Sequence, residues 1–248
     1  MTTIAELIDL SQAYLHDLPP AAPTPPVPQG EEIASFIDHT LLKPEATAEQ
    51  VKIICQEARQ HAFAAVCVNP SFVPLVHGLL KGTKILVCAV AGFPLGASLP
   101  SIKAFETLTL LEHGANEIDM VINIGALKDG AYGLVLNDIA GVVQTAHNQQ
   151  AQVKVIIETG LLSQQEKILA CLLSKAAGAD FVKTSTGFST GGATVEDIDL
   201  MHRIVGPQVK VKASGGVRNL ADALAMIQAG ASRIGTSSGI KILQEATS

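Results

Sequence analysis

Two lysine residues stand where an amine could act on a carbonyl compound. Lys183 ends the short apolar run Phe181-Val182-Lys183, and Lys212 lies in a second β-rich run at 210–213. A buried ammonium group is costly unless it is paired or neutral, so lysines in apolar strands are rare as purely structural residues. A neutral amine is a nucleophile toward carbonyl carbons, whereas an ammonium ion is not. The two lysines therefore indicate Schiff-base chemistry.

This chemistry requires that one of the two lysines loses its proton near neutral pH. Two ammonium groups about 6 Å apart in an effective dielectric constant of about 20 repel by roughly 3 kcal/mol, which lowers the pKa of one amine by about two. Desolvation lowers that pKa further. We expect the nitrogen atoms of Lys183 and Lys212 to face each other, with no salt bridge on Lys183. The competing interpretation is a structural lysine that is paired or reaches solvent.

Lys210 is a rival to Lys212, because both lie on the same side of a regular strand. Lys212 is nearer the carboxyl end of that strand, where parallel barrels carry their functional groups, and is therefore preferred. Schiff-base chemistry also needs a group that moves protons, and a carboxylate in the same mouth supplies it. Asp119 and Asp38 are the candidates, and Glu158 is either a further mouth residue or a salt-bridge partner.

Glycine-rich turns after two consecutive β-rich runs could bind an anionic group. Gly215-Gly216 follow the run at 210–213, and Gly235-Thr236-Ser237-Ser238 open the last helix. Backbone N–H groups at a helix start, accessible because glycine lacks a side chain, form a phosphate cradle. Thr186 and Gly187, in a third turn, add further donors. These turns predict a phosphorylated small-molecule ligand.

Composition excludes several other classes of protein. The 248 residues hold 17 Lys+Arg and 23 Asp+Glu, a formal net charge of −6, so the basic excess needed for nucleic-acid binding is missing. No run approaches the roughly 20 apolar residues of a membrane span. The seven histidines are scattered, His39 is interpreted as a structural residue, and no metal or cofactor is predicted. The four cysteines show no C-x-x-C spacing and indicate buried thiols in the reducing cytoplasm.

The elements that would position these residues alternate regularly from about residue 33. Strands are predicted at 35–40, 64–68, 84–90, 117–123, 153–158, 180–184, 210–213 and 233–236. Helices are predicted near 47–60, 71–80, 101–113, 131–148, 164–177, 194–204, 219–228 and 238–245. Eight strand–helix pairs in roughly 215 residues are the count of an α/β fold of the (β/α)8 TIM-barrel type. A doubly wound sheet is the alternative, but no glycine-rich dinucleotide turn follows the first strand.

The first thirty residues differ in composition from the rest. Six prolines between Pro19 and Pro28 favour an extended, semi-rigid linker. Before them, Thr3 and Glu6 have the spacing of a capping box at the start of an amphipathic helix. We therefore predict a helical extension with a proline-rich linker over residues 1–30 and the barrel over 31–248. The apolar stripe of the helix must cover the barrel's own surface or a neighbouring subunit.

Several motifs around these residues resemble those of the deoxyribose-phosphate aldolase family, in the family's order and over roughly residues 31–246. They are Phe36-Ile37-Asp38-His39-Thr40-Leu41-Leu42-Lys43-Pro44, Glu117-Ile118-Asp119-Met120-Val121, Lys154-Val155-Ile156-Ile157-Glu158-Thr159, Phe181-Val182-Lys183-Thr184-Ser185-Thr186-Gly187 and Val211-Lys212-Ala213-Ser214-Gly215-Gly216-Val217-Arg218. The two lysine motifs together are highly specific for that family.

The resemblance implies a role for each candidate in the mouth of the barrel. Lys183 is expected to be the Schiff-base lysine, Lys212 the second lysine that perturbs it and assists proton transfer, and Asp119 the proton relay. Asp38 and Thr40 match positions that line the pocket. The implied reaction is the reversible, metal-free cleavage of 2-deoxy-D-ribose 5-phosphate to D-glyceraldehyde 3-phosphate and acetaldehyde.

The phosphate site implied by the resemblance comprises Gly215, Gly216, Gly235, Ser237 and Ser238, with Thr186 and Gly187 beside them. Some family members carry a lysine where this chain has Phe188, so phosphate affinity is expected to depend more on backbone donors here. Two other functions stay open: a Schiff-base aldolase for a different phosphosugar, and a noncatalytic barrel that binds a sugar phosphate. The sequence also leaves open a homodimer or a homotetramer.

Overall fold

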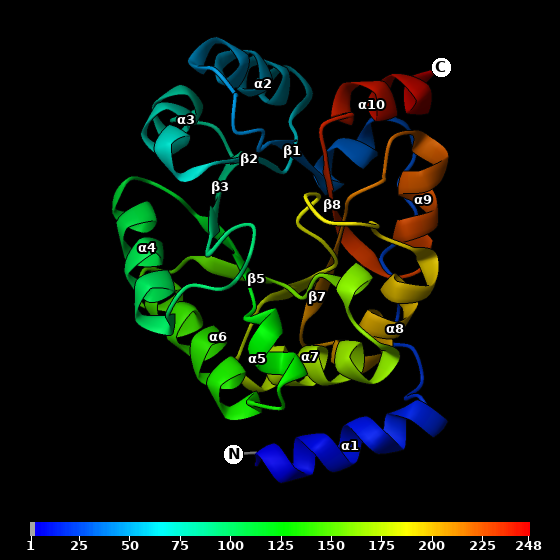
Figure 1. Cartoon of the computed structure of the whole chain (residues 1–248). Helices are drawn as coiled ribbons and strands as arrows, with labels where there is room; N and C mark the ends of the chain where they lie inside the picture. The colour runs from blue at the N-terminus through cyan, green and yellow to red at the C-terminus, as the bar shows by residue number, and fades with distance from the viewer. Residues whose placement is uncertain (1–2) are drawn as a thin grey trace.

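The computed structural model describes residues 3–248 and shows a closed barrel of parallel strands inside a ring of helices (Figure 1). The strands pair in chain order, and β8 closes the barrel on β1. They are β1 (Ile37–Leu41), β2 (Ala65–Val68), β3 (Leu86–Ala91), β4 (Glu117–Val121), β5 (Gln152–Ile156), β6 (Phe181–Lys183), β7 (Lys210–Ser214) and β8 (Ala231–Thr236). The predicted (β/α)8 fold is confirmed.

Helices follow every strand and cover the outer face of the barrel. The α-helices are α1 (Ile4–His16), α2 (Ala48–His61), α3 (Val73–Leu80), α4 (Pro100–Glu112), α5 (Ile124–Lys128), α6 (Tyr132–His147), α7 (Gln164–Ala176), α8 (Val195–Val205), α9 (Leu220–Gln228) and α10 (Gly239–Thr247). Three 3-10 helices complete the set: η1 (Gly30–Phe36), η2 (Pro70–Phe72) and η3 (Thr159–Leu161). None of the helices in the described part of the chain combines the length and apolar composition needed to cross a bilayer.

Most strand boundaries differ from the prediction by one or two residues, and three of the differences have local reasons. The first strand begins at Ile37, later than predicted, because the preceding residues form η1. The fourth ends at Val121, since the side chain of Asn123 caps the short helix α5 by accepting a hydrogen bond from the N–H of Ala126 at 3.0 Å. The fifth ends at Ile156, before Glu158, whose φ of 58° lies in the left-handed region and interrupts extended pairing.

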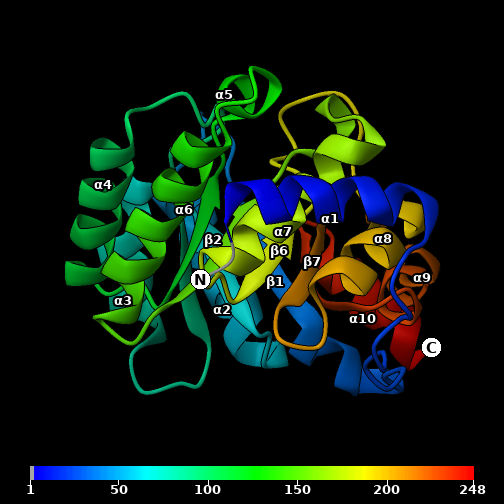
Figure 2. The same cartoon turned by 90° about the horizontal axis from the view of Figure 1, so that it is seen from below.

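The N-terminal helix α1 lies outside the helix ring and packs against α7 (Figures 1 and 2). The predicted capping box is present, with the N–H of Glu6 donating to Thr3 Oγ1 at 3.2 Å. Leu7 on the inner face of α1 is buried. The linker that follows is held to α8, where His202 Nε2 donates to the carbonyl oxygen of Ala22 at 2.9 Å. The apolar stripe of α1 therefore covers the chain's own barrel, and the boundary near residue 30 stays a prediction.

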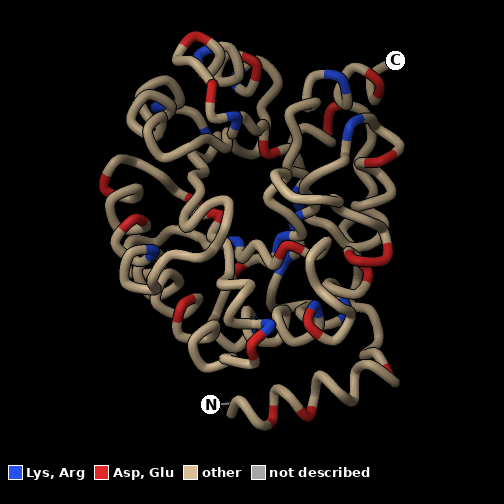
Figure 3. The backbone as a smooth tube through the Cα atoms, in the orientation of Figure 1, with Lys and Arg blue, Asp and Glu red and all other residues tan. Residues whose placement is uncertain are grey.

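The interior of the barrel is not uniformly apolar. The main apolar core lies between the strands and the surrounding helices. Inside the barrel, a smaller apolar cluster on the β1–β3 side contains Leu42, Ala65, Cys67, Cys88 and Val90. Charged side chains fill much of the remaining interior, and charged positions lie on the strands around the barrel axis as well as on the outer helices (Figure 3).

Candidate active site

Every strand of the barrel contributes at least one titratable side chain to the interior. The parallel register places Lys183 opposite Lys212 on β6 and β7, and Asp119 opposite Lys154 on β4 and β5. Residues paired in this way point to the same face of a sheet, here the inner one. The full set is Asp38 (β1), Cys67 (β2), Cys88 (β3), Glu117 and Asp119 (β4), Lys154 (β5), Lys183 (β6), Lys212 (β7) and Arg233 (β8). We call these nine residues the interior cluster.

Asp119 is the centre of the interior cluster. Its Oδ2 accepts hydrogen bonds from both Lys183 Nζ at 2.7 Å and Lys212 Nζ at 2.8 Å. Its Oδ1 accepts from Lys154 Nζ at 3.0 Å and from the thiol of Cys88 at 3.1 Å. The carboxylate is completely buried. The thiol of Cys67 lies 4.0 Å from Oδ2, so three of the five hydrogen-bond donors around this carboxylate are ammonium groups.

This arrangement corrects one expectation about Lys183. The sequence argument required Lys183 to be free of a salt bridge, but Lys183 pairs with Asp119. The two lysine nitrogens do come together as expected, since both contact the same oxygen. Because that oxygen carries negative charge, it offsets the repulsion between the two lysines. The sequence argument considered only the repulsion between the two ammonium groups and left out the carboxylate that both of them contact.

The charges of the interior cluster strongly shift the pKa values of most of its members. Burial alone would raise the pKa of Asp119, but the charges of Lys154, Lys183 and Lys212 lower it well below its usual range. Burial alone would lower the pKa of Lys212, but Asp119 and Asp38 raise it above its usual range. At neutral pH, Asp119 is therefore an anion and Lys212 a cation.

A deeper group of charges supports this pair from the amino-terminal side. Asp38 Oδ2 lies 2.6 Å from Lys212 Nζ, and Asp38 Oδ1 accepts a hydrogen bond from Arg233. The other end of the Arg233 guanidinium donates to Glu117 at 2.8 Å. Glu117 in turn lies 2.6 Å from Lys154 Nζ. Each carboxylate in this layer is therefore shared between at least two cations.

The cations of the cluster also occupy the sites at which a metal ion could otherwise bind. Two groups of potential ligands lie close enough together, one formed by Cys67, Cys88 and Asp119 and the other by Asp38, Cys88 and Glu117. Lys154 Nζ lies within hydrogen-bonding distance of Cys88, Glu117 and Asp119, and so contacts members of both groups. The acidic side chains are therefore neutralised by lysine.

A cavity of about 430 Å³ opens above the cluster at the carboxyl ends of the strands. Lys183 lines it, whereas Asp38, Asp119 and Lys212 are completely buried beneath it. The other predicted binding residues all line it: Thr40, Thr186, Gly187, Gly215, Gly216, Gly235, Ser237 and Ser238. Asp38 was expected at the lining and instead lies below, because Lys212 and Arg233 hold its carboxylate inside the barrel.

The glycine-rich turns of this cavity have the backbone that the sequence suggested. Gly215 and Gly216 have φ values of 82° and 84°, a conformation that favours glycine. Two of the predicted donor residues, Thr186 and Ser238, already donate to other groups of the protein, however. The N–H and hydroxyl of Thr186 both donate to Glu158 Oε2, at 3.1 and 2.5 Å, and the N–H of Ser238 donates to Thr236 Oγ1 at 2.9 Å. Thr186 therefore shapes its loop instead of offering donors, and Glu158 is the acceptor that holds it.

Three functional candidates were missed in the sequence. Lys154, Glu117 and Arg233 received no role there, yet they complete the ion pairs of the interior cluster. The signal was present, because Lys154 and Arg233 interrupt apolar strands just as Lys183 does. The preference for Lys212 over Lys210 agrees with the structure, since Lys210 is exposed and its Nζ lies 5.4 Å from the centre of the Phe181 ring.

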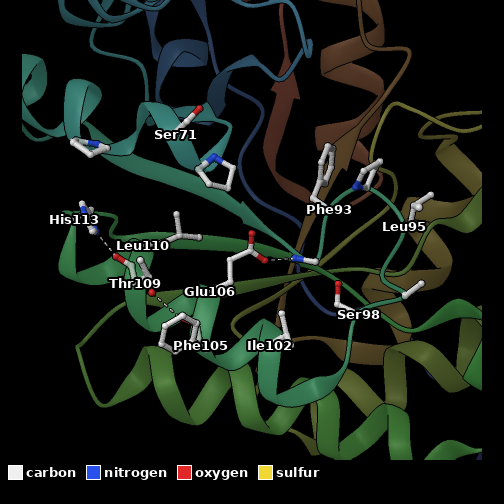
Figure 4. Close-up of a pocket in the computed structure, with 15 residues that line it drawn as sticks. Ser71, Phe93, Leu95, Ser98, Ile102, Phe105, Glu106, Thr109, Leu110 and His113 are labelled. Atoms are coloured by element: carbon white, nitrogen blue, oxygen red, sulfur yellow. Dashed lines mark hydrogen bonds between the residues drawn. The ribbon is translucent and has the colours of Figure 1, made fainter.

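A larger cavity of about 840 Å³ lies outside the barrel between η2, α4 and the loop after β3 (Figure 4). Its walls are mainly apolar and include Phe93, Ile102 and Phe105. Its two titratable groups already have partners: Glu106 accepts from the N–H of Gly92 at 2.8 Å, and His113 Nδ1 contacts the carbonyl oxygen of Thr109 at 2.7 Å. The smaller cavity, which holds the perturbed charges, is therefore the candidate active site.

A parallel barrel with a lysine that lines the cavity at its mouth and a buried carboxylate beneath it has the features of an enzyme for carbonyl chemistry. Comparison with known proteins identifies the enzyme family within this class. The sequence model of the DeoC/LacD family aldolases matches residues 33–245. The chain belongs to this family and is an aldehyde-lyase, an enzyme that breaks and forms carbon–carbon bonds.

Individual relatives agree with this assignment. The deoxyribose-phosphate aldolase of Clostridium tetani is 60% identical over 214 residues, which cover 86% of this chain and 99% of the relative. That of Thermococcus gammatolerans is 58% identical over 219 residues, 88% of this chain and 97% of the relative. The solved structure of the Aeropyrum pernix deoxyribose-phosphate aldolase, described as a unique tetramer, aligns with a TM-score of 0.83 and 33% identity over 100% of this chain and 99% of that one.

Proposed function

We propose that this aldolase reversibly cleaves 2-deoxy-D-ribose 5-phosphate to D-glyceraldehyde 3-phosphate and acetaldehyde through a Schiff base on Lys183. One observation carries the choice of lysine: within the interior cluster, Lys183 is the only cation that also lines the cavity. The substrate is supported by the name that the relatives at about 60% identity share.

The reaction begins when the neutral Nζ of Lys183 attacks C1 of the open-chain sugar. Loss of water from the carbinolamine gives an iminium ion, which is the electron sink for bond cleavage. The C3 hydroxyl then loses its proton, the C2–C3 bond breaks, and C3 leaves as the aldehyde of glyceraldehyde 3-phosphate. The remaining enamine takes a proton at C2, and hydrolysis of the resulting iminium ion releases acetaldehyde. In the synthetic direction the same enamine attacks the acceptor aldehyde.

Asp119 and Lys212 manage the protons in this scheme. Both lysine nitrogens contact Asp119 Oδ2, so this oxygen links the reacting nitrogen to the second lysine. Each step after the first attack needs a proton moved over a short distance, and a positioned carboxylate does this efficiently. Lys212 keeps the carboxylate anionic and oriented. Asp38 acts one step further away, by holding Lys212 in place.

The turns after β7 and β8 are the proposed site for the phosphate group. Gly215 and Gly216 follow β7, and Ser237 and Ser238 precede α10, whose N-terminus favours an anion. Thr40 and Gly187 complete the wall between these turns and Lys183. Phe188 also lines the cavity, and its ring packs edge-on against Phe93 with centroids 5.4 Å apart. This part of the rim supplies apolar surface instead of charge.

Trapping of the imine tests this proposal directly. The protein is incubated with acetaldehyde and borohydride, digested, and mapped by mass spectrometry, with pyruvate and dihydroxyacetone phosphate as alternative donors. We expect reduced acetaldehyde on Lys183 and no adduct on Lys210, the exposed lysine of β7. Preferential trapping of pyruvate or dihydroxyacetone phosphate would identify an aldolase for another phosphosugar. An unmodified Lys183 with every donor would indicate a barrel that only binds sugar phosphates.

We also infer a homo-oligomer, either a dimer or a tetramer, and a cytoplasmic location. The description of the Aeropyrum pernix structure as tetrameric supports the first inference. The second is supported by four cysteines that are all free and buried, as expected in a reducing compartment. Light scattering on the purified protein measures the assembly, and a mass of one chain at micromolar concentration would contradict it.

A further inference from the structure

The interior cluster contains unequal numbers of positive and negative groups. Its carboxylates are Asp38, Glu117 and Asp119, and its cations are Lys154, Lys183, Lys212 and Arg233. All of these side chains are completely buried except Lys183, which is 3% exposed, and Arg233, which is 12% exposed. With every group ionised, the cluster carries one excess positive charge. Loss of a single proton from one lysine balances it.

The contacts identify Lys183 as the lysine that can lose this proton at least cost. Lys212 contacts two carboxylates, and Lys154 lies within 4 Å of three. Arg233 contacts two carboxylates and stays ionised in proteins. Lys183 pairs with Asp119 alone. After Lys183 loses its proton, each buried carboxylate still keeps at least two cationic partners, so no anion is left uncompensated.

We propose that Glu117 and Arg233 set the pH at which Lys183 becomes a nucleophile, although neither of them touches Lys183 or lines the cavity. Glu117 lies on β4 two residues closer to the amino end than Asp119, and Arg233 bridges it to Asp38. Both act on Lys183 through the charge balance of the buried interior, where charges interact over longer distances than in water. They are positioning residues, and the inference rests on the proposed role of Lys183.

Two thiols lie beside Asp119, and two further cations, Lys43 and Arg218, line the cavity that Lys183 also lines. Cys88 is hydrogen-bonded to Asp119, and burial raises its pKa well above the usual range, so it stays neutral. The pKa of Cys67 is lowered, chiefly by its hydrogen bond with Cys88. A thiolate at Cys67 would add a negative charge to the cluster, so the test includes a variant at this position.

The experiment follows the acidic limb of the pH profile of kcat/KM, which reports the free enzyme. Glu117→Gln removes a negative charge and should move this limb to lower pH by about one unit, the effect of a unit charge about 10 Å away at an effective dielectric constant of about 20. Arg233→Met removes a positive charge and should move the limb upward by about the same amount. The double variant restores the balance and should return the limb to within about 0.3 pH units of wild type.

Three further variants guard against a purely structural explanation. Arg233→Lys keeps the charge but loses the forked geometry, and should keep the wild-type limb. Lys210→Met removes a cation from the exposed end of β7, outside the cluster, and should also leave the limb in place. Cys67→Ala should shift the limb by less than about 0.3 pH units, because a neutral thiol carries no charge. If Arg233→Met does not fold, Glu117→Gln and Arg233→Lys still carry the test.

The results separate this inference from the proposed function. Imine trapping on Lys183 is measured in every variant. If Lys183 is trapped but Glu117→Gln and Arg233→Met leave the limb unmoved, or move it in the same direction, the charge-balance inference is wrong and the proposed function stands. A shift caused by Cys67→Ala as large as that of Glu117→Gln would also overturn the inference. If Lys183 is not trapped even in the wild type, the proposed function fails first.

Discussion

The two halves of the barrel contribute opposite charges to the same interior. Strands β1–β4 supply all of the carboxylates and thiols of the interior cluster, whereas β5–β8 supply all of its cations. The first half also holds the small apolar cluster, and the second half carries the glycine-rich turns that we assign to the phosphate. The acidic half therefore stabilises buried cations, and the basic half supplies most of the cavity lining, to which Thr40 on β1 also contributes.

Closure of the barrel brings the carboxylates of the first half into contact with the cations of the second. The halves meet at two seams, where Lys154 on β5 contacts the carboxylates of β4, and Arg233 on β8 contacts Asp38 on β1. Across the interior, Lys183 and Lys212 both reach Asp119. Because the strands form a ring, every charged group of the interior cluster lies beside at least one group of opposite charge. The cluster has one more cation than it has carboxylates, and Lys183 is the cation that lies at the mouth of the barrel.

The largest effect on activity is expected from substitution of Lys183. Lys183→Ala should lower kcat/KM by at least about 10⁴-fold, because no other lysine of the cluster reaches the cavity. Steady-state cleavage of 2-deoxy-D-ribose 5-phosphate measures the loss. Lys210→Ala, a change of the same type at the exposed amino-terminal end of β7, should keep wild-type turnover. Substantial activity in Lys183→Ala would mean that the division of the barrel does not explain the chemistry.

Loss of the second lysine should have a smaller effect with a clear direction. Lys212→Leu should reduce kcat/KM by about 10²–10³-fold, as for the loss of a positioned proton-transfer group. It also removes a positive charge near Lys183, so the acidic limb of the pH profile should move to higher pH. A wild-type pH profile in this variant would show that Lys212 does not influence the reacting amine electrostatically.

The acidic half should contribute to stability as well as to activity. Asp119→Asn leaves three lysine nitrogens around a neutral amide and should lower the free energy of unfolding by about 3–5 kcal/mol. Since the pKa of Asp119 is lowered in the folded state, its stabilisation is fully present above its unfolded-state pKa of about 3.9 and is lost as the pH falls below that value. Urea unfolding from about pH 2.5 to pH 8 measures this.

Asp129→Asn, at an exposed position after α5, is the matched control and should change the free energy of unfolding by less than about 0.5 kcal/mol. The difference between Asp119→Asn and wild type should be constant from pH 6 to 8 and should shrink below about pH 4. A difference that grew on acidification would contradict the assignment of Asp119 as a buried anion.

The smallest effect is expected outside the barrel. Deletion of residues 1–29 uncovers the face of α7 that α1 buries and should cost about 2 kcal/mol, roughly the burial of Leu7, and lower Tm by about 4–8 °C. The barrel should still fold and retain its activity, since relatives at 60% identity match 86% of this chain with 99% of their own length. Loss of activity on deletion would contradict a separate boundary near residue 30.

Much of the fold could be predicted from short-range patterns. Each strand and each helix of eight residues or more was located to within a few residues, because apolar periodicity, caps and glycine-rich helix ends are local signals. The short helices α5 and η1 were not predicted. The errors fell where a local interaction overrides periodicity, as in the left-handed backbone of Glu158 and the cap of Asn123 on α5. The lysine pair was recognised because charged residues rarely interrupt a buried strand.

The partners of those lysines could not be predicted in the same way. Asp38 was expected at the wall of the cavity and lies beneath it, and Thr186 was expected to offer donors that Glu158 already accepts. Lys154 and Arg233 have the same signature as Lys183 but were not recognised. Their importance depends on which carboxylates stand across the barrel, and sequence spacing does not define that distance.

The amino-acid sequence by itself determined the kind of protein this is: eight strand–helix units, two lysines at the ends of neighbouring strands, and glycine-rich turns beyond them. Local propensity and hydrophobic periodicity act over a few residues, so these features can be recognised along the chain. Only the tertiary structure decided which lysine lines the cavity and which charges balance it. Arg233 can bridge Asp38 and Glu117 only when β8 pairs with β1 and closes the barrel around these buried groups.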